Sequence, residues 1–317
     1  MSKATTSKFQ LRKRTTSEKL VDIGFQKLVI AMASMVGIIL LSIFVVVYYE
    51  SIESISRYGL KFLFSSDWNP VTDDYGAFTA IYGTLFTSLA SLLVAIPLGV
   101  GTAIFITENI IPKYLRDLIG IMVELLAAIP SVVLGLWAVF IMEPFIRPFL
   151  NLIYELFGFI PFFGTQPLGA GMMPAILILV VMILPIITSI SKDSLNQVPS
   201  NLRQAAYGIG ASRWTTIFKV IIPASISGIT GGVLLALGRA MGETMAVTMI
   251  IGNSNNFSWS IFAPSYTISS MLANQFGEAD GIQVSSLMYA ALILMVLTLI
   301  VNVFAQWIVK KLSLKYQ

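Results

Sequence analysis

Arg239 and Glu243 stand four residues apart in a stretch of otherwise apolar and small residues. Side chains at this spacing lie on one face of a helix and can contact each other. A guanidinium is permanently charged and suits bidentate contact with an oxyanion such as phosphate, and a neighbouring carboxylate that competes for it would ease release. Two interpretations remain open: an internal salt bridge that fixes helix packing, or two residues that line the pathway of an anion.

Glu124 is the third charged residue that falls clearly within an apolar stretch, and Pro130 and Ser131 follow shortly after it. A charge at the centre of a bilayer costs at least about 2.5–3.5 kcal/mol, so each of these charges needs a reason to be there. We expect Glu124, Pro130 and Ser131 to be structural or to lie on the pathway. A proline inside a membrane-crossing helix also predicts a kink.

The composition of the chain shows what surrounds these residues. Of its 317 residues, 56% are hydrophobic and 11% are charged, whereas a soluble domain carries roughly 25% charged residues. This composition predicts a polytopic membrane protein. The chain has no cysteine and no histidine, which excludes thiol chemistry and removes the commonest general base and metal ligand. We therefore expect no enzymatic activity, no metal and no cofactor on this chain.

Six apolar runs are long enough to cross a bilayer as helices, which predicts an all-α integral membrane protein with six transmembrane helices. The runs are Leu28–Tyr49, Ala77–Thr107, Leu115–Met142, Met172–Ser191, Ala224–Ile251 and Ser285–Val309. If the N-terminus is cytoplasmic, 16 of the 20 Lys and Arg residues fall inside the cell. The positive-inside rule therefore places both termini in the cytoplasm.

The spans divide the chain into four parts. These are a basic cytoplasmic tail at 1–27, the first helix with an external segment at 28–76, a core domain at 77–309 with a cytoplasmic loop at 192–223, and a cytoplasmic tail at 310–317. Two external segments, Glu143–Gly171 and Gly252–Val284, are each expected to contain a short helix. All external segments are either connecting loops or a surface that contacts an external partner or forms part of a gate.

The loop at 192–223 has a recognisable internal order. Pro199 and Ser200 begin a short helix, which carries a small apolar stripe, and Gly208 and Gly210 end it. A second apolar segment follows and ends at Pro223. Taken by itself, this pattern is also compatible with an ordinary amphipathic connector.

The same loop resembles the coupling loop of ABC importer permeases. Ala205-Ala206, Gly210 after three residues, and Val220-Ile221-Ile222-Pro223 after nine more keep the spacing of the family pattern Glu-Ala-Ala, Gly, Ile-x-Leu-Pro. Gln204 departs from that pattern, because the family most often has glutamate there. The resemblance implies that Gln204, Ala205, Ala206, Gly210 and Pro223 contact an ATP-hydrolysing subunit.

Further stretches resemble the permeases of the high-affinity phosphate (Pst) system. They are Ile81–Ser88, Leu126–Gly135 and Gly238–Val247, and the Met245-Ala246-Val247 and Trp68-Asn69-Pro70 sequences are similar to PstC-type rather than PstA-type subunits. The resemblance implies a type I ABC importer (MetI-like) permease fold in the bacterial cytoplasmic (inner) membrane. It also implies that the chain forms half of a pathway for inorganic phosphate, with Arg239 and Glu243 along it.

The resemblance implies several partners. They are a homologous second permease (PstA-like), a dimer of ATPase subunits (PstB-like) that binds ATP and Mg, and an external phosphate-binding protein (PstS-like). This chain has no G-x-x-x-x-G-K-[ST] motif of its own. Two alternatives remain: a secondary anion carrier in which a membrane carboxylate relays protons, and an importer of the same family for another oxyanion.

Overall fold

The structure is a computed structural model, and it describes residues 16–108 and 110–313. The described residues divide into two units on either side of the boundary between Tyr49 and Glu50. The first unit consists of the greater part of α1 (Thr16–Tyr58), which carries no charged residue from Leu28 to Tyr49, as expected for a helix surrounded by lipid. Much of the basic tail predicted at 1–27 lies outside the described residues, as do the last four residues of the tail predicted at 310–317.

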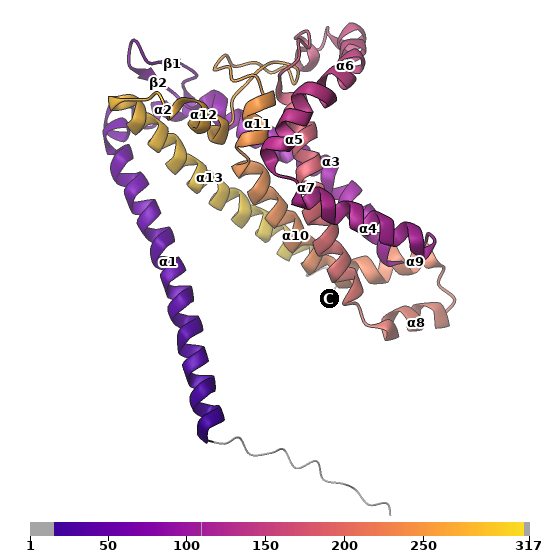
Figure 1. Ribbon diagram of the computed structural model, residues 1–317. Helices are drawn as coiled ribbons and strands as arrows, with labels where there is room; N and C mark the ends of the chain where they lie inside the picture. The colour runs from indigo at the N-terminus through magenta and orange to yellow at the C-terminus, as the bar shows by residue number, and fades with distance from the viewer. Residues whose placement is uncertain (1–15, 109, 314–317) are drawn as a thin grey trace, which may run out of the picture. The chain divides into compact units, whose positions relative to one another are not determined.

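The second unit is built almost entirely from helices (Figure 1). After the end of α1 come α2 (Lys61–Phe64), β1 (Trp68–Asn69), β2 (Asp74–Tyr75), α3 (Phe78–Thr107), α4 (Lys113–Ala128), α5 (Ser131–Trp137), the π-helix η1 (Ala138–Met142), α6 (Glu143–Phe157), the short helix η2 (Pro161–Phe163) and α7 (Met172–Asn196). They are followed by α8 (Ser200–Gly208), α9 (Arg213–Thr216), the π-helix η3 (Ile217–Ile221), α10 (Ile222–Gly242), α11 (Met245–Ile250), α12 (Ile268–Gln275) and α13 (Gly281–Ser313). The two strands pair antiparallel, with Trp68 opposite Tyr75.

Among the described residues, six helical segments are long and apolar enough to cross a membrane, which confirms the predicted number. They are Lys19–Tyr58, Phe78–Thr107, Ser131–Phe157, Met172–Asn196, Arg213–Gly242 and Gly281–Trp307. Figure 1 shows α2, α12 and the two strands at one end of the second unit and α8 at the other. This arrangement agrees with the prediction that 50–76 and 252–284 lie on one side of the membrane and 192–223 on the other.

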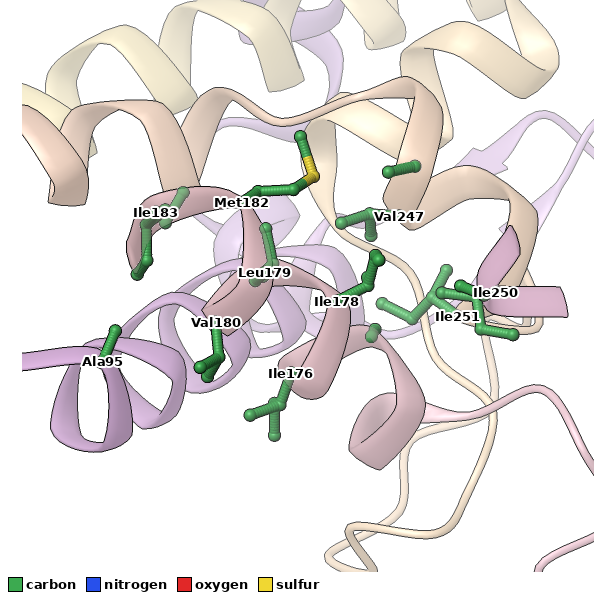
Figure 2. Packing of buried hydrophobic residues seen from close by; sticks show 14 of the residues in the cluster. Ala95, Ile176, Ile178, Leu179, Val180, Met182, Ile183, Val247, Ile250 and Ile251 are labelled. Carbon is green, nitrogen blue, oxygen red and sulfur yellow. The ribbon is translucent and has the colours of Figure 1, made fainter. Parts of the chain in front are cut away.

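The helix α7 is the centre of the core. It packs against α3 and α10, and most of its apolar side chains are buried, including Ile178, Leu179 and Ile183. They belong to one buried cluster with Val247, Ile250 and Ile251 of the segment around α11, and Figure 2 shows Ile178 on the side of the cluster toward these three residues. Membrane helices gain little from apolar burial against lipid, so this dense packing is what holds the helices together.

The prediction for the third span was wrong. The run Leu115–Met142 is not one helix, because α4 ends at Ala128 and Ile129 has extended backbone with ψ 127°. The residue before a proline avoids the helical conformation, so Pro130 divides the run in two and does more than kink it. The candidate span begins at Ser131 and continues through α6 to Phe157, so the helix expected outside the membrane is the end of this span.

The fifth span is also interrupted. The run Ala224–Ile251 consists of α10 and α11, because Glu243 between them has extended backbone with ψ 125°. Arg239 therefore lies in the last turn of α10 and not in the middle of a longer helix. The short helix predicted within Gly252–Val284 is confirmed as α12.

Candidate functional site

Arg239 and Glu243 meet at the interruption between α10 and α11. Arg239 Nη2 lies 3.7 Å from Glu243 Oε2, and Glu243 Oε1 accepts the backbone N–H of Ala246 at 3.4 Å. A cation is favoured at the C-terminal end of a helix and an anion at an N-terminal end, so both charges suit their places. The Glu243 side chain is 7% exposed and that of Arg239 is 46% exposed.

A second interrupted helix packs beside this pair. The helix α5 contacts α11, and Gly135 makes the close approach possible. A Cβ atom at Gly135 would lie 2.8 Å from Met249 Sδ and 3.0 Å from Ala246 Cα. Ala246 therefore leaves no room for a side chain at position 135, and its backbone N–H donates to Glu243. The glycine thus lets α5 pack directly against α11, whose Ala246 is hydrogen-bonded to Glu243.

A cavity of about 200 Å³ lies at the meeting point. The charged side chain in its wall is Arg239 of α10. The apolar lining comes from α4, α5, α7 and the break between α4 and α5, and consists of Leu126, Ala127, Ile129, Leu134, Met182 and Ile186. Met182 and Ile186 stand near the middle of α7, which crosses the whole core. The guanidinium therefore opens into a cavity near the middle of α7, between side chains of α4, α5 and α7.

The structure treats the other predicted pathway residues differently. Pro130 precedes the first residue of α5, Ser131, so both belong to the interruption beside the cavity. Glu124 lies on α4, is 73% exposed, and has Lys192 Nζ at 3.9 Å. Pro130 and Ser131 therefore stand between two residues that line the cavity of Arg239, Ile129 and Leu134, but do not line it themselves, while Glu124 lines a separate pocket with Lys192.

The predicted coupling residues lie on and after α8. Gln204 and Ala205 are exposed, and Ala206 is buried at 5% exposure. Gly210 has a φ of +84°, a conformation that a residue with a side chain rarely adopts, so glycine is needed to turn the chain from α8 into α9. Pro223 stands in the first turn of α10, directly after the π-helix η3, so its missing backbone N–H falls where the helical hydrogen-bond pattern changes.

Two ion pairs with a buried carboxylate were not found by the sequence reasoning. Arg147 donates from Nε and Nη2 to the two oxygens of Glu143, both at 2.7 Å, inside the candidate span. The four-residue spacing of Glu143 and Arg147 was a usable signal, but the segment was interpreted as external. The second pair joins Arg203 of α8 to Glu108 after α3. These residues are 95 positions apart, and no local sequence pattern predicts a contact between residues so far apart.

The glycines of α10 divide into two groups. A Cβ atom at Gly228 would lie 2.0 Å from Ser194 Oγ, and one at Gly232 would lie 3.0 Å from Ile190 Cβ, so this part of α10 packs closely on α7. No described atom of the chain lies within 4 Å of a Cβ placed at Gly238 or Gly242. The first two glycines therefore allow close packing of α10 on α7 within the same chain.

Comparison with known proteins places this architecture in a family. Residues 95–314 match the family model described as "Binding-protein-dependent transport system inner membrane component". The phosphate transport system permease protein PstC of Mesorhizobium japonicum is 44% identical over 93% of this chain and 91% of its own length. The PstC protein of Haemophilus influenzae is 40% identical over 91% of this chain and 93% of its own.

Solved structures support the fold. A bacterial alginate ABC transporter, in complex with an alginate-bound periplasmic protein, matches with a TM-score of 0.60 at 17% identity over 92% of this chain and 97% of that chain. The inward-facing methionine transporter MetNI matches with a TM-score of 0.51 over 75% and 94% of the two chains. The chain has the MetI-like permease fold, and it belongs to the family of binding-protein-dependent transport system inner membrane components and, within it, to the PstC permeases.

Proposed function

We propose that this chain is the permease subunit of an ATP-driven importer of inorganic phosphate and forms half of its translocation pathway. The observation that carries the proposal is the position of Arg239, whose half-exposed guanidinium opens into an otherwise apolar cavity near the middle of α7. Relatives named as phosphate transport permeases, 37–44% identical over nearly the whole chain, support phosphate as the substrate.

Arg239 and Glu243 act as a pair in this proposal. The guanidinium binds the anion as it enters the cavity, because charge-assisted hydrogen bonds between a guanidinium and phosphate are stronger than neutral ones. Glu243 lies on one side of Arg239 and weakens this attraction, so that the phosphate can leave. The breaks before Glu243 and before Ser131 allow backbone polar groups to face a cavity, as membrane transport sites require.

The driving force comes from partner subunits. A homologous second permease (PstA-like) completes the pathway, and an external phosphate-binding protein (PstS-like) delivers the substrate. An ATPase dimer (PstB-like) holds ATP and Mg, and α8 docks on it through Gln204 and Ala205, which are exposed. ATP binding then displaces α8 and changes which side of the membrane the cavity faces, with both termini and α8 in the cytoplasm.

Uptake of radiolabelled phosphate into vesicles tests the proposal. The chain and its candidate partners are reconstituted with and without ATP inside and binding protein outside. We expect uptake that needs both and that survives collapse of the proton gradient. Arg239→Gln should abolish it, and Arg239→Lys, which keeps the charge but loses the bidentate fork, should retain a small part.

The control is Lys113→Gln, which removes an exposed cation outside the cavity. Uptake that ignores ATP and stops with the proton gradient would instead establish a secondary carrier. Competition by sulfate as strong as by phosphate would establish an importer for oxyanions in general. Normal phosphate uptake by both Arg239 variants would eliminate the pathway role of Arg239.

A further inference from the structure

The helix α8 is attached to the rest of the second unit by few side chains. All nine residues of α8 are described, and Ala206 is the one that is buried. The turn at Pro199 precedes the helix, and Gly210, with φ +84°, follows it. A helix held only at its two ends can tilt unless a side chain in its middle contacts the neighbouring helices.

Arg203 makes such a contact. It stands in the middle of α8, and its side chain is 23% exposed. Its Nη1 donates to Glu108 Oε1, in the residue directly after α3. Its Nη2 donates at 2.8 Å to the carbonyl oxygen of Leu195, in the last turn of α7. One guanidinium therefore joins α8 to the ends of two membrane-crossing helices.

Electrostatics explains why an arginine is needed there. The C-terminal end of a helix carries a partial negative charge and free carbonyl groups. Glu108 adds a full negative charge at the end of α3, and its side chain is only 5% exposed. A buried carboxylate in this position requires a cation, and the fork of Arg203 reaches both the carboxylate and the Leu195 carbonyl, which a lysine could not do.

The two helix ends that Arg203 contacts are firmly packed. A small apolar cluster beside them consists of Ala103, Ile104, Leu195, Val198, Ile217 and Ile221. The helices α3 and α7 also pack along their length, and α7 carries Met182 and Ile186 of the cavity wall. A displacement of α8 that passes through Arg203 therefore reaches the helix that lines the cavity.

We propose that Arg203, held by Glu108 and the Leu195 carbonyl, is the positioning residue that transmits movement of α8 to α3 and α7. This inference rests on the proposed function. Without the two contacts of Arg203, α8 still docks on the ATPase and ATP is still hydrolysed, but less of the movement of α8 reaches the cavity. The expected consequence is uncoupling, seen as less phosphate transported for each ATP hydrolysed.

The test compares the reconstituted complex carrying the wild-type chain, Arg203→Lys, and the double variant Arg203→Met with Glu108→Met. The double variant removes both charges together and so avoids a buried unpaired carboxylate. We expect ATP hydrolysis to stay within about twofold of wild type and phosphate transported per ATP to fall about tenfold in the double variant. Arg203→Lys should show a smaller fall, because Lys keeps one of the two contacts. Lys113→Gln, a cation lost outside the loop, should leave the ratio unchanged.

A second measurement does not depend on phosphate. Since the chain has no cysteine, a spin label on Asn201→Cys, an exposed position of α8, reports the mobility of the helix alone. The label should become more mobile in the double variant.

The outcomes separate the two proposals. A wild-type complex without ATP-driven phosphate uptake would overturn the proposed function, whatever the label shows. A wild-type ratio of phosphate to ATP in the assembled double variant would overturn the role of Arg203. If the double variant does not assemble, an unchanged ratio in Arg203→Lys overturns it, and so does a parallel loss of ATP hydrolysis and uptake.

Discussion

Replacing Glu243 by glutamine removes a negative charge that lies 3.7 Å from Arg239 while keeping the side-chain oxygen that accepts the Ala246 amide. At this distance and an effective dielectric constant of about 20, the attraction between the two charges is about 4.5 kcal/mol before screening. Because half of the Arg239 side chain is exposed, most of this is lost to solvent, and we expect about 1–2 kcal/mol to remain. Arg239 in Glu243→Gln should therefore bind phosphate about 5–30-fold more tightly.

The assay is equilibrium binding of radiolabelled phosphate to the purified permease complex without the binding protein, together with the rate of ATP-driven uptake. Tighter binding should be accompanied by slower release and therefore by slower uptake at saturation. The control is Glu155→Gln, which removes an exposed carboxylate from α6. If Glu243→Gln binds phosphate no more tightly and only lowers the thermal stability, the pair is an internal salt bridge and the competition argument is refuted.

Three further predictions concern stability and assembly. Gly210→Ala should cost about 1–2 kcal/mol at the end of α8, because its φ of +84° strains any side chain; limited proteolysis after α8 should become faster. Gly228→Val should lower the melting temperature of the isolated chain because its side chain would collide with Ser194, whereas Gly238→Val, which points into open space, should not. Arg147→Gln should also lower the melting temperature, because it leaves a buried carboxylate without its bidentate partner; an unchanged melting temperature would show that this pair does not hold the span.

Local features of the chain were enough to predict the class of fold and the short helix within the loop at 192–223. The number of membrane-crossing helices follows from the length of apolar runs, because an apolar helix of that length can span a bilayer with all its backbone groups bonded. The start of α8 after Pro199 and the turn at Gly210 follow from backbone preferences that each residue carries by itself. The four-residue spacing of Arg239 and Glu243 likewise predicted that they contact each other, as they do.

The positions of the helix ends were less predictable. The sequence predicted a kink at Pro130. Whether a proline kinks a membrane helix or divides it in two depends on what the freed backbone groups contact. The interruption at Glu243 has no proline, and it arises where α11 turns to pack on α5 through Gly135. A hydropathy count cannot register such a turn, so the spans around both interruptions were misplaced.

The sequence by itself determined that this is a membrane protein, which charged residues lie within its apolar stretches, and which short loop resembles the coupling loop of ABC importer permeases. Only the tertiary structure decided what surrounds those charges. It placed Arg239 at a cavity formed by four helices, left Glu124 in a separate pocket with Lys192, and brought Arg203 to Glu108 across 95 residues. The physical reason is that hydropathy and backbone preference act over a few residues, whereas the partner of a buried charge is chosen by the packing of whole helices.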